Sequence, residues 1–196
     1  MTPKKYRISN GMELTEYQHL PEKSVFVISD LHLDHKEIIS CFKRPFRTVR
    51  KMNEVLINNW NYVVKPDDTV FFVGDLVFGS PDKFFSKLNG KIRIISGNHD
   101  KELDPKGLHE TLLYSYKGID FFFIHETIKR KEKMPKDFDG WIIHGHHHNN
   151  NTEWFPFFCP EKKRINVSVE LVKYQPVSLD FIVSLIKEGH EKITSL

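Results

Sequence analysis

The stretch VFVISDLH, residues 25–32, is a short apolar run that leads directly into an aspartate and a histidine. Short runs of β-branched and aromatic residues are typical of buried strands. In open α/β sheets, ligands bind beyond the carboxyl ends of the strands. Asp30 and His32 are therefore candidate functional residues at the end of a strand.

The same pattern recurs four more times along the chain. Each run is mainly apolar and is followed by, or ends on, side chains that bind metals. These runs are residues 70–73 before Gly74-Asp75, 92–96 before Gly97-Asn98-His99-Asp100, 121–124 before His125, and 141–144 before Gly145-His146-His147-His148. Because strand ends meet at one edge of a sheet, the pattern predicts that these Asp, Asn and His side chains gather at one place.

The spacing of apolar residues also predicts the elements between these strands. Helical spacing occurs over residues 35–42, 51–62, 81–88 and 179–187, with Ser178 as a candidate N-cap of the last helix. Further strands are expected over 111–116, 120–124, 140–144 and 165–169, with little helix between them. A βαβ first half and a strand-rich second half predict two sheets packed face to face with helices outside.

Length and composition favour one domain. The 196 residues, of which 39% are hydrophobic, are enough for a sizeable core, so we expect a single domain over residues 1–196. An Asn10-Gly11 pair between short apolar segments predicts a β-hairpin extension within residues 1–20. The two cysteines, Cys41 and Cys159, lie far apart and exclude a disulfide scaffold.

Charge and hydropathy narrow the partners and the compartment. The 29 basic and 26 acidic residues nearly balance, so the charge gives little support to nucleic-acid binding. No apolar run approaches the roughly 20 residues that a membrane helix needs, and the N-terminus lacks the apolar region of a secretory signal. We therefore expect a cytoplasmic protein without a membrane partner, and the sequence predicts no particular oligomeric state.

The ordered motifs Asp-x-His, Gly-Asp, Gly-Asn-His-Asp, a lone histidine after a strand, and Gly-His-x-His together resemble the calcineurin-like metallophosphoesterase superfamily. Each motif is weak alone, but all occur here in order from about residue 25 to residue 169. The resemblance implies an α/β fold, a four-layer α/β/β/α sandwich of two mixed β-sheets flanked by helices. That architecture agrees with the two sheets expected from the sequence pattern.

The resemblance also implies a centre with two divalent metal ions. One ion would be held by Asp30, His32 and His148, the other by Asn98, His125 and His146, and Asp75 would bridge them. Imidazole, carboxylate and amide oxygen suit Mn²⁺, Zn²⁺, Fe, Co²⁺ or Ni²⁺. Two carboxylates against two divalent cations leave a positive site, which predicts a phosphorylated small molecule or a nucleotide as the substrate.

The reaction implied by the resemblance is hydrolysis of a phosphate mono- or diester by a metal-bridging hydroxide. His99 resembles the family's catalytic histidine, which would protonate the leaving oxygen or neutralise its charge. Asp100 would then orient the other ring nitrogen of His99.

Substrate contacts are predicted next to the metal motifs. His35 follows the first motif, and guanidinium groups such as those of Arg44 and Arg47 suit phosphate oxygens. Related chains often carry glycine at the position of Asp34, so the loop that begins there is expected to differ. The aromatic residues 154–158 could rim the site and select the organic part of the substrate.

Two other functions remain open on the sequence alone. A metal-dependent nuclease would use the same motifs, but it would need a longer basic groove. A catalytically silent metal-binding scaffold of the same fold would be expected to have lost ligands or the histidine of Gly-Asn-His-Asp. All of these residues are present.

Overall fold

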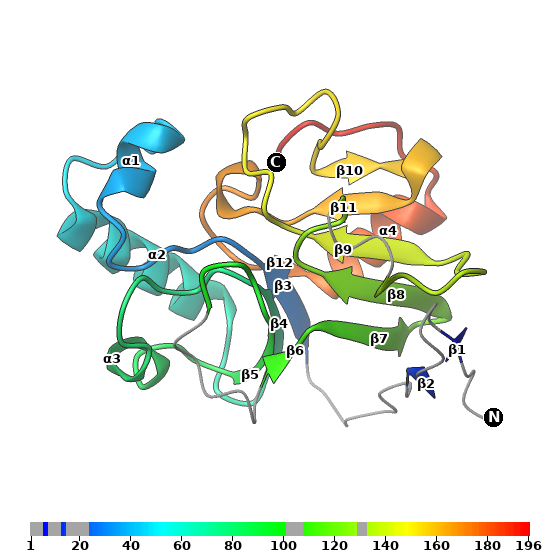
Figure 1. Cartoon of the computed structure of the whole chain (residues 1–196), viewed down its shortest axis with the longest axis horizontal. Helices are drawn as coiled ribbons and strands as arrows, with labels where there is room; N and C mark the ends of the chain where they lie inside the picture. Colours follow the sequence, from blue (N-terminus) through cyan, green and yellow to red (C-terminus); the bar gives the residue numbers. More distant parts are fainter. Residues whose placement is uncertain (1–5, 8–12, 15–23, 101–107, 129–132) are drawn as a thin grey trace.

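The computed structural model describes residues 6–7, 13–14, 24–100, 108–128 and 133–196 (Figure 1). Its described strands form two five-stranded sheets and a small two-stranded pair, β1 (Tyr6–Arg7) with β2 (Glu13–Leu14). This antiparallel pair lies within residues 1–20, where the sequence predicts a hairpin, and the predicted Asn10-Gly11 turn lies outside the described residues.

The first large sheet carries the strands that precede the first three motifs. Its order is β12 (Val177–Ser178), β3 (Val25–Ile28), β4 (Thr69–Val73), β5 (Lys91–Ile95) and β6 (Leu108–His109). The four strands from β3 to β6 run parallel, and β12 is antiparallel to β3. The carboxyl ends of β3, β4 and β5 therefore lie at the same edge.

The second large sheet carries the strands that precede the histidine motifs. Its order is β10 (Phe158–Cys159), β11 (Arg164–Asn166), β9 (Trp141–His144), β8 (Ile119–Ile124) and β7 (Thr111–Tyr116). The three central strands β11, β9 and β8 run parallel, and both edge strands are antiparallel to their neighbours. Both sheets are thus mixed, as predicted.

The core lies between the two sheets and on the outer face of the first. Phe71 in β4 contacts Tyr114 and Phe123 of the second sheet, with ring centroids 4.8 Å apart in both cases. The next residue, Phe72, points to the opposite face and contacts Trp60, at 6.4 Å between ring centroids. This alternation explains why every residue of β4 is buried.

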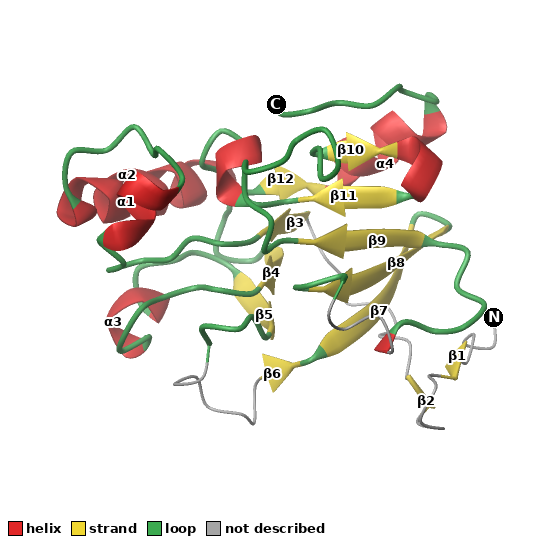
Figure 2. Cartoon of the chain, turned by 45° about the horizontal axis from the view of Figure 1, so that its top comes forward, coloured by secondary structure: helices red, strands yellow, loops and turns green. Residues whose placement is uncertain are grey.

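Helices cover the first sheet. Trp60 belongs to α2 (Val49–Val63), which lies beside α1 (Glu37–Cys41) and α3 (Asp82–Phe85) (Figure 2). The last helix, α4 (Leu179–Lys187), contacts β12 and β3 and starts where Ser178 accepts a hydrogen bond from the Phe181 amide at 3.1 Å. Ser178 is thus the predicted N-cap. The outer face of the second sheet packs against Met134 and Phe138.

Two predicted elements end earlier than expected. The helix predicted over 81–88 stops at Phe85, because the amides of Lys87 and Leu88 bond to carbonyls three residues earlier and form tight turns. The strand predicted over 165–169 stops at Asn166. Beyond it, the Ser29 amide donates to Val167 at 3.0 Å and the Val169 amide donates to Ser29 at 3.2 Å. These bonds join the two sheets beyond the end of β3.

Candidate metal centre

The connections that follow β3 and β4 lie side by side. The Asp30 amide donates to the carbonyl of Gly74 at 2.9 Å, and the His32 amide donates to the carbonyl of Asp75 at 3.0 Å. The motif residues of the two strands are therefore held together by backbone hydrogen bonds as well as by the sheet.

Several motif residues have left-handed backbone conformations. The φ angle is +59° at Asp30, +49° at His32, +62° at Asp75, +70° at His146 and +47° at His148. Non-glycine residues rarely adopt this region, and such strain clusters at functional sites. The local backbone is thus arranged to turn these side chains toward one another.

The glycines of the motifs leave room for these side chains. A Cβ atom at Gly97 would lie 2.0 Å from Asp75 Oδ1, and one at Gly145 would lie 2.5 Å from Asp30 Oδ2. A Cβ atom at Gly74 would lie 2.3 Å from His125 Nδ1. Each glycine is required because a carboxylate, a hydroxyl or an imidazole of a neighbouring residue occupies the space of its missing side chain.

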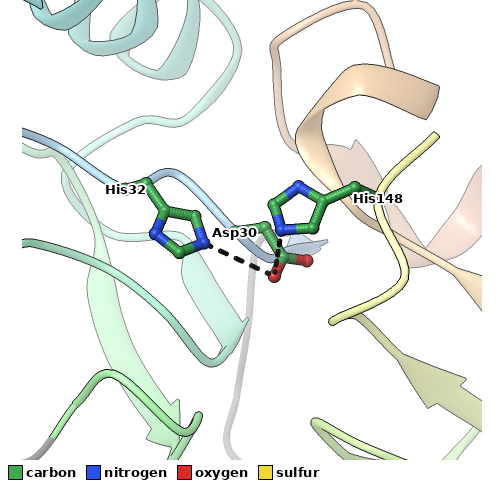
Figure 3. Close-up of side chains that lie close together, drawn as sticks. All are labelled: Asp30, His32 and His148. Atoms are coloured by element: carbon green, nitrogen blue, oxygen red, sulfur yellow. Dashed lines mark ion pairs between the residues drawn. The ribbon is translucent and has the colours of Figure 1, made fainter. Parts of the chain in front are cut away.

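One group of possible ligands comprises Asp30, His32 and His148, and all three are buried. Both imidazole rings point at the Asp30 carboxylate (Figure 3), with Nε2 of His148 and of His32 at 3.6 and 4.0 Å from Oδ1. The other carboxylate oxygen, Oδ2, accepts hydrogen bonds from Ser29 Oγ at 2.6 Å and Ser168 Oγ at 2.8 Å. These bonds fix the carboxylate and leave Oδ1 facing the histidines.

The second group comprises Asp75, His125 and His146. Asn98 joins it, because its Oδ1 atom lies 2.9 Å from His146 Nδ1 and 3.2 Å from His125 Nε2. The His125 Nδ1 atom lies 2.7 Å from the Val73 carbonyl, which accepts a hydrogen bond from it, so Nε2 is the ring nitrogen that faces Asn98 and Asp75. Among the described residues, the two groups contain all seven predicted ligands, counting Asn98.

Asp75 lies between the two groups. Its Oδ2 atom is 3.6 Å from His32 Nε2 and 3.3 Å from His125 Nε2. Its Oδ1 atom accepts a hydrogen bond from the His99 amide at 2.9 Å. One carboxylate oxygen thus faces a histidine of each group.

The charges of the site shift the pKa values of its members. Burial lowers the pKa of His32 to about 3. Burial also opposes protonation of His125, but the hydrogen bond to Asp75 and the charges of Asp30 and Asp75 prevail and raise its pKa to about 9. Burial alone would raise the pKa of Asp75, whereas His125 and His32 together hold it below the usual value.

The donor atoms fit a divalent metal. Among the described side chains, His32 Nε2 is a buried ring nitrogen without a hydrogen-bond partner, although it faces Asp30 and Asp75. An unpaired buried polar atom is costly, and a metal ion between these oxygens would satisfy it. Histidine nitrogens with carboxylate and amide oxygens suit divalent transition metals. The structure therefore holds two groups of side chains that could each bind a metal ion.

Comparison with known proteins agrees with this geometry. The family model described as the calcineurin-like phosphoesterase superfamily domain matches residues 24–155. The chain belongs to the calcineurin-like phosphoesterase superfamily. The matched residues include every motif residue from Asp30 to His148, and the two mixed sheets are those expected for the metallophosphatase fold.

Individual relatives cover different shares of this chain. An uncharacterized protein of Methanocaldococcus jannaschii is 44% identical over 172 residues, which are 85% of this chain and 93% of that protein. The gene 66 protein of Mycobacterium phage L5 is 35% identical over 78 residues, 37% of each chain. A solved structure of a protein of unknown function from Aquifex aeolicus has a TM-score of 0.65 at 25% identity, covering 83% of this chain and 99% of that one.

In this member of the superfamily, His99 and His35 lie beside the first group of possible ligands. The His99 side chain is exposed, and its ring centroid is 5.3 Å from that of His32 and 6.1 Å from that of His35. The His35 Nδ1 atom lies 3.2 Å from His32 Nδ1. Both residues, which the sequence predicted to lie at the site, are therefore next to the first group of possible ligands.

Asp100 does not take the predicted position beside the His99 ring. Its Oδ2 atom accepts hydrogen bonds from the amides of Asp75 and Gly97, both at 2.8 Å, and Oδ1 accepts from Leu76 at 3.0 Å. Burial raises the pKa of this carboxyl group above its usual value, although the three amides oppose that shift. Asp100 fastens together the two loops that carry Asp75 and Asn98, so we correct its role to that of a positioning residue.

Arg44 is also placed differently from the prediction. Its guanidinium is fully buried and donates to the carbonyls of Asp30 and Leu31 at 2.7 and 2.8 Å. The same group pairs with Glu170 at 2.7 Å. Arg44 thus has no group left for a phosphate, and the predicted substrate contact is wrong. Arg47 is exposed.

Glu170 and Ser168 are functional candidates that the sequence analysis missed. Glu170 lies within 3.0 and 3.1 Å of His148 Nδ1 through its two oxygens, and Ser168 bonds to Asp30. Both follow β11 in an alternation of apolar and polar residues, which normally indicates a half-exposed strand, yet Ser168 is fully buried. Only the tertiary contact with the end of β3 reveals their position.

The aromatic residues 154–158 do not form one continuous rim. Phe157 and Phe158 are buried in the core, and Phe155 stacks on His147 with ring centroids 3.5 Å apart. Trp154 is exposed, and the Lys162 Nζ atom lies 4.6 Å from the centroid of its ring. Among the helices in the described part of the chain, none has the length and apolar character needed to span a membrane.

Proposed function

We propose that this protein is a two-metal phosphoesterase that hydrolyses a phosphate mono- or diester. The observation that supports this most is the position of Asp75, whose Oδ2 atom faces His32 and His125 of separate ligand groups. Two bound divalent metals would neutralise the phosphoryl oxygens and lower the pKa of a water nucleophile. The candidate metals are Mn²⁺, Zn²⁺, Fe, Co²⁺ and Ni²⁺.

In this proposal each ligand group holds one metal. Asp30, His32 and His148 would hold a metal at the more buried position, Asn98, His125 and His146 would hold one at the more exposed position, and Asp75 would contribute to both. The Nδ1 contacts of His125 and His148 orient both Nε2 atoms toward the centre. His99 lies above this centre with its backbone tied to Asp75, which suits donation of a proton to the leaving oxygen.

Hydrolysis of two chromogenic esters tests the proposal. Metal-stripped protein should be inactive on p-nitrophenyl phosphate and bis-p-nitrophenyl phosphate, and adding back Mn²⁺, Zn²⁺, Co²⁺ or Ni²⁺ singly should restore turnover. The ester cleaved faster gives the preference for monoester or diester. Tight binding of two metals without turnover of either ester would instead favour the silent scaffold, and cleavage confined to DNA or RNA would favour the nuclease.

Replacing the Arg44–Glu170 pair with neutral residues should weaken the binding of one metal ion more than that of the other. Glu170 orients His148 and Arg44 holds the left-handed Asp30 backbone, so both act on the buried ligand group. The double variant Arg44→Met, Glu170→Gln removes both charges and leaves no unpaired buried ion. We expect one Mn²⁺ equivalent to bind about 10- to 100-fold more weakly, while the other is unchanged.

Isothermal titration of Mn²⁺ into the stripped variant measures both equivalents. The control is Arg50→Met, Glu54→Gln, which removes an exposed pair of the same residue types at 3.2 Å on α2 and should change neither. Equal weakening of both equivalents would show that the buried pair supports the fold as a whole and not one metal.

A further inference from the structure

The surface beside His99 ends in an exposed aromatic ring. Phe78 is 54% exposed, and its ring stacks on His35 with a centroid distance of 4.6 Å and an interplanar angle of 15°. The His35 ring in turn lies 5.2 Å from that of His32. A row of three rings thus runs from a proposed metal ligand to solvent.

This aromatic shelf, defined as His35 and Phe78, is fixed by its backbone. The Phe78 amide donates to the Leu33 carbonyl at 2.8 Å, and the Leu33 amide donates to the Leu76 carbonyl at 2.9 Å. Leu33 and Leu76 are fully buried. Phe78 is therefore an exposed side chain on a backbone anchored in the core, unlike an aromatic residue on a free loop.

The base of the shelf holds a strained residue. Asp34 has a φ angle of +61°, a conformation that glycine adopts at lower cost. The Asp34 side chain and amide bond to Asn53 of α2 at 2.6 and 3.1 Å, and Lys83 pairs with the same carboxylate at 2.6 Å. Two helices thus hold the loop in a conformation that keeps His35 between His32 and Phe78.

From this arrangement we propose that the shelf binds a nucleobase of the substrate, an inference that rests on the proposed function for the placement of the phosphoryl group. A phosphoryl group bound at the proposed metals would lie near His32. The first ring of the shelf, His35, is the next ring from His32 toward solvent. A nucleotide fits this layout, because its ribose separates a flat aromatic base from its phosphate. The base would stack on the open face of Phe78, as bases do on exposed aromatic side chains.

Binding of adenosine 5′-monophosphate and ribose 5-phosphate, each as its non-hydrolysable methylenephosphonate analogue, tests the shelf separately from hydrolysis. The two probes share the phosphorylated ribose and differ by the base. By calorimetry on Mn²⁺-loaded protein, we expect the wild type to prefer the nucleotide by about 5- to 150-fold. Phe78→Ala should remove this preference without changing the affinity for ribose 5-phosphate, and Phe78→Tyr should retain it.

Phe181→Ala is the matched control, because Phe181 is a 40% exposed phenylalanine on α4, and this variant should keep the preference. Equal affinity of the wild type for both probes, or binding of neither, would overturn the shelf. An equal loss of affinity for both probes in Phe78→Ala would also overturn the shelf. A preference that Phe78→Ala removes in a protein inactive on both chromogenic esters would retain the shelf and reject the hydrolase.

Discussion

Replacing Asp75 with asparagine should abolish metal-dependent hydrolysis. The substitution keeps the size of the side chain. Its amide oxygen can still accept the hydrogen bond that the His99 backbone amide donates to Asp75 Oδ1. It removes the negative charge and one oxygen donor from the point between His32 and His125. Changes to residues that only support metal ligands lower metal affinity by about 10- to 100-fold. Because Asp75 is itself a proposed ligand, we expect Asp75→Asn to lower metal affinity by more than about 100-fold.

Metal content and turnover should be measured together on Asp75→Asn. Mass spectrometry of the dialysed protein should show fewer than the wild-type number of metal ions, and turnover of both p-nitrophenyl esters should fall to background. Asp180→Asn changes an aspartate on α4, which bonds to Tyr116 at 2.9 Å, and should leave both quantities unchanged. Wild-type metal content and turnover in Asp75→Asn would refute a bridging role.

The second large effect is expected for His99→Ala. The ring of His99 is exposed beside His32, whereas the contact with Asp75 is made by the His99 backbone amide. The variant should therefore keep its metals and lose the proton donor. Loss of a general acid typically lowers turnover by about 100- to 10,000-fold.

The leaving group distinguishes a proton donor from a substrate-binding residue. A phenyl ester leaves a more basic oxygen than a p-nitrophenyl ester, so it depends more on protonation. We expect kcat for phenyl phosphate to fall much more in His99→Ala than kcat for p-nitrophenyl phosphate. The variant His190→Ala, which changes an exposed histidine after α4, should affect neither ester. An equal fall for both esters would point to binding.

The sequence predicted the sheet strands and the gathering of the candidate metal ligands because both depend on local pattern. An apolar run predicts a buried strand, and the order of Asp30, Asp75, Asn98 and His125 along parallel strands predicts a shared edge. These parts of the fold agree with the structure. The helix at residues 81–88 was overestimated, since the periodicity of apolar residues does not reveal where tight turns replace it.

The residues that support the centre could not be predicted in the same way. Arg44 was assigned to the substrate because its charge suits phosphate, yet it lies buried against Glu170, 126 positions away in the sequence. The resemblance assigned Asp100 to the His99 ring, yet its carboxylate accepts hydrogen bonds from the backbone amides of Asp75 and Leu76 in another loop. Such partners depend on how separate segments meet in three dimensions, and residue type and spacing carry no record of it.

The hydrogen bonds between Ser29 and residues 167–169 have a consequence for the order of assembly. They join the two sheets at the place where the Ser168 hydroxyl donates a hydrogen bond to the Asp30 carboxylate. A growing chain possesses Asp30 and His32 long before it acquires His148 and the segment that joins the sheets, and these contacts are remote in sequence. A metal at the proposed buried position would therefore gain its full set of ligands only once the two sheets are joined.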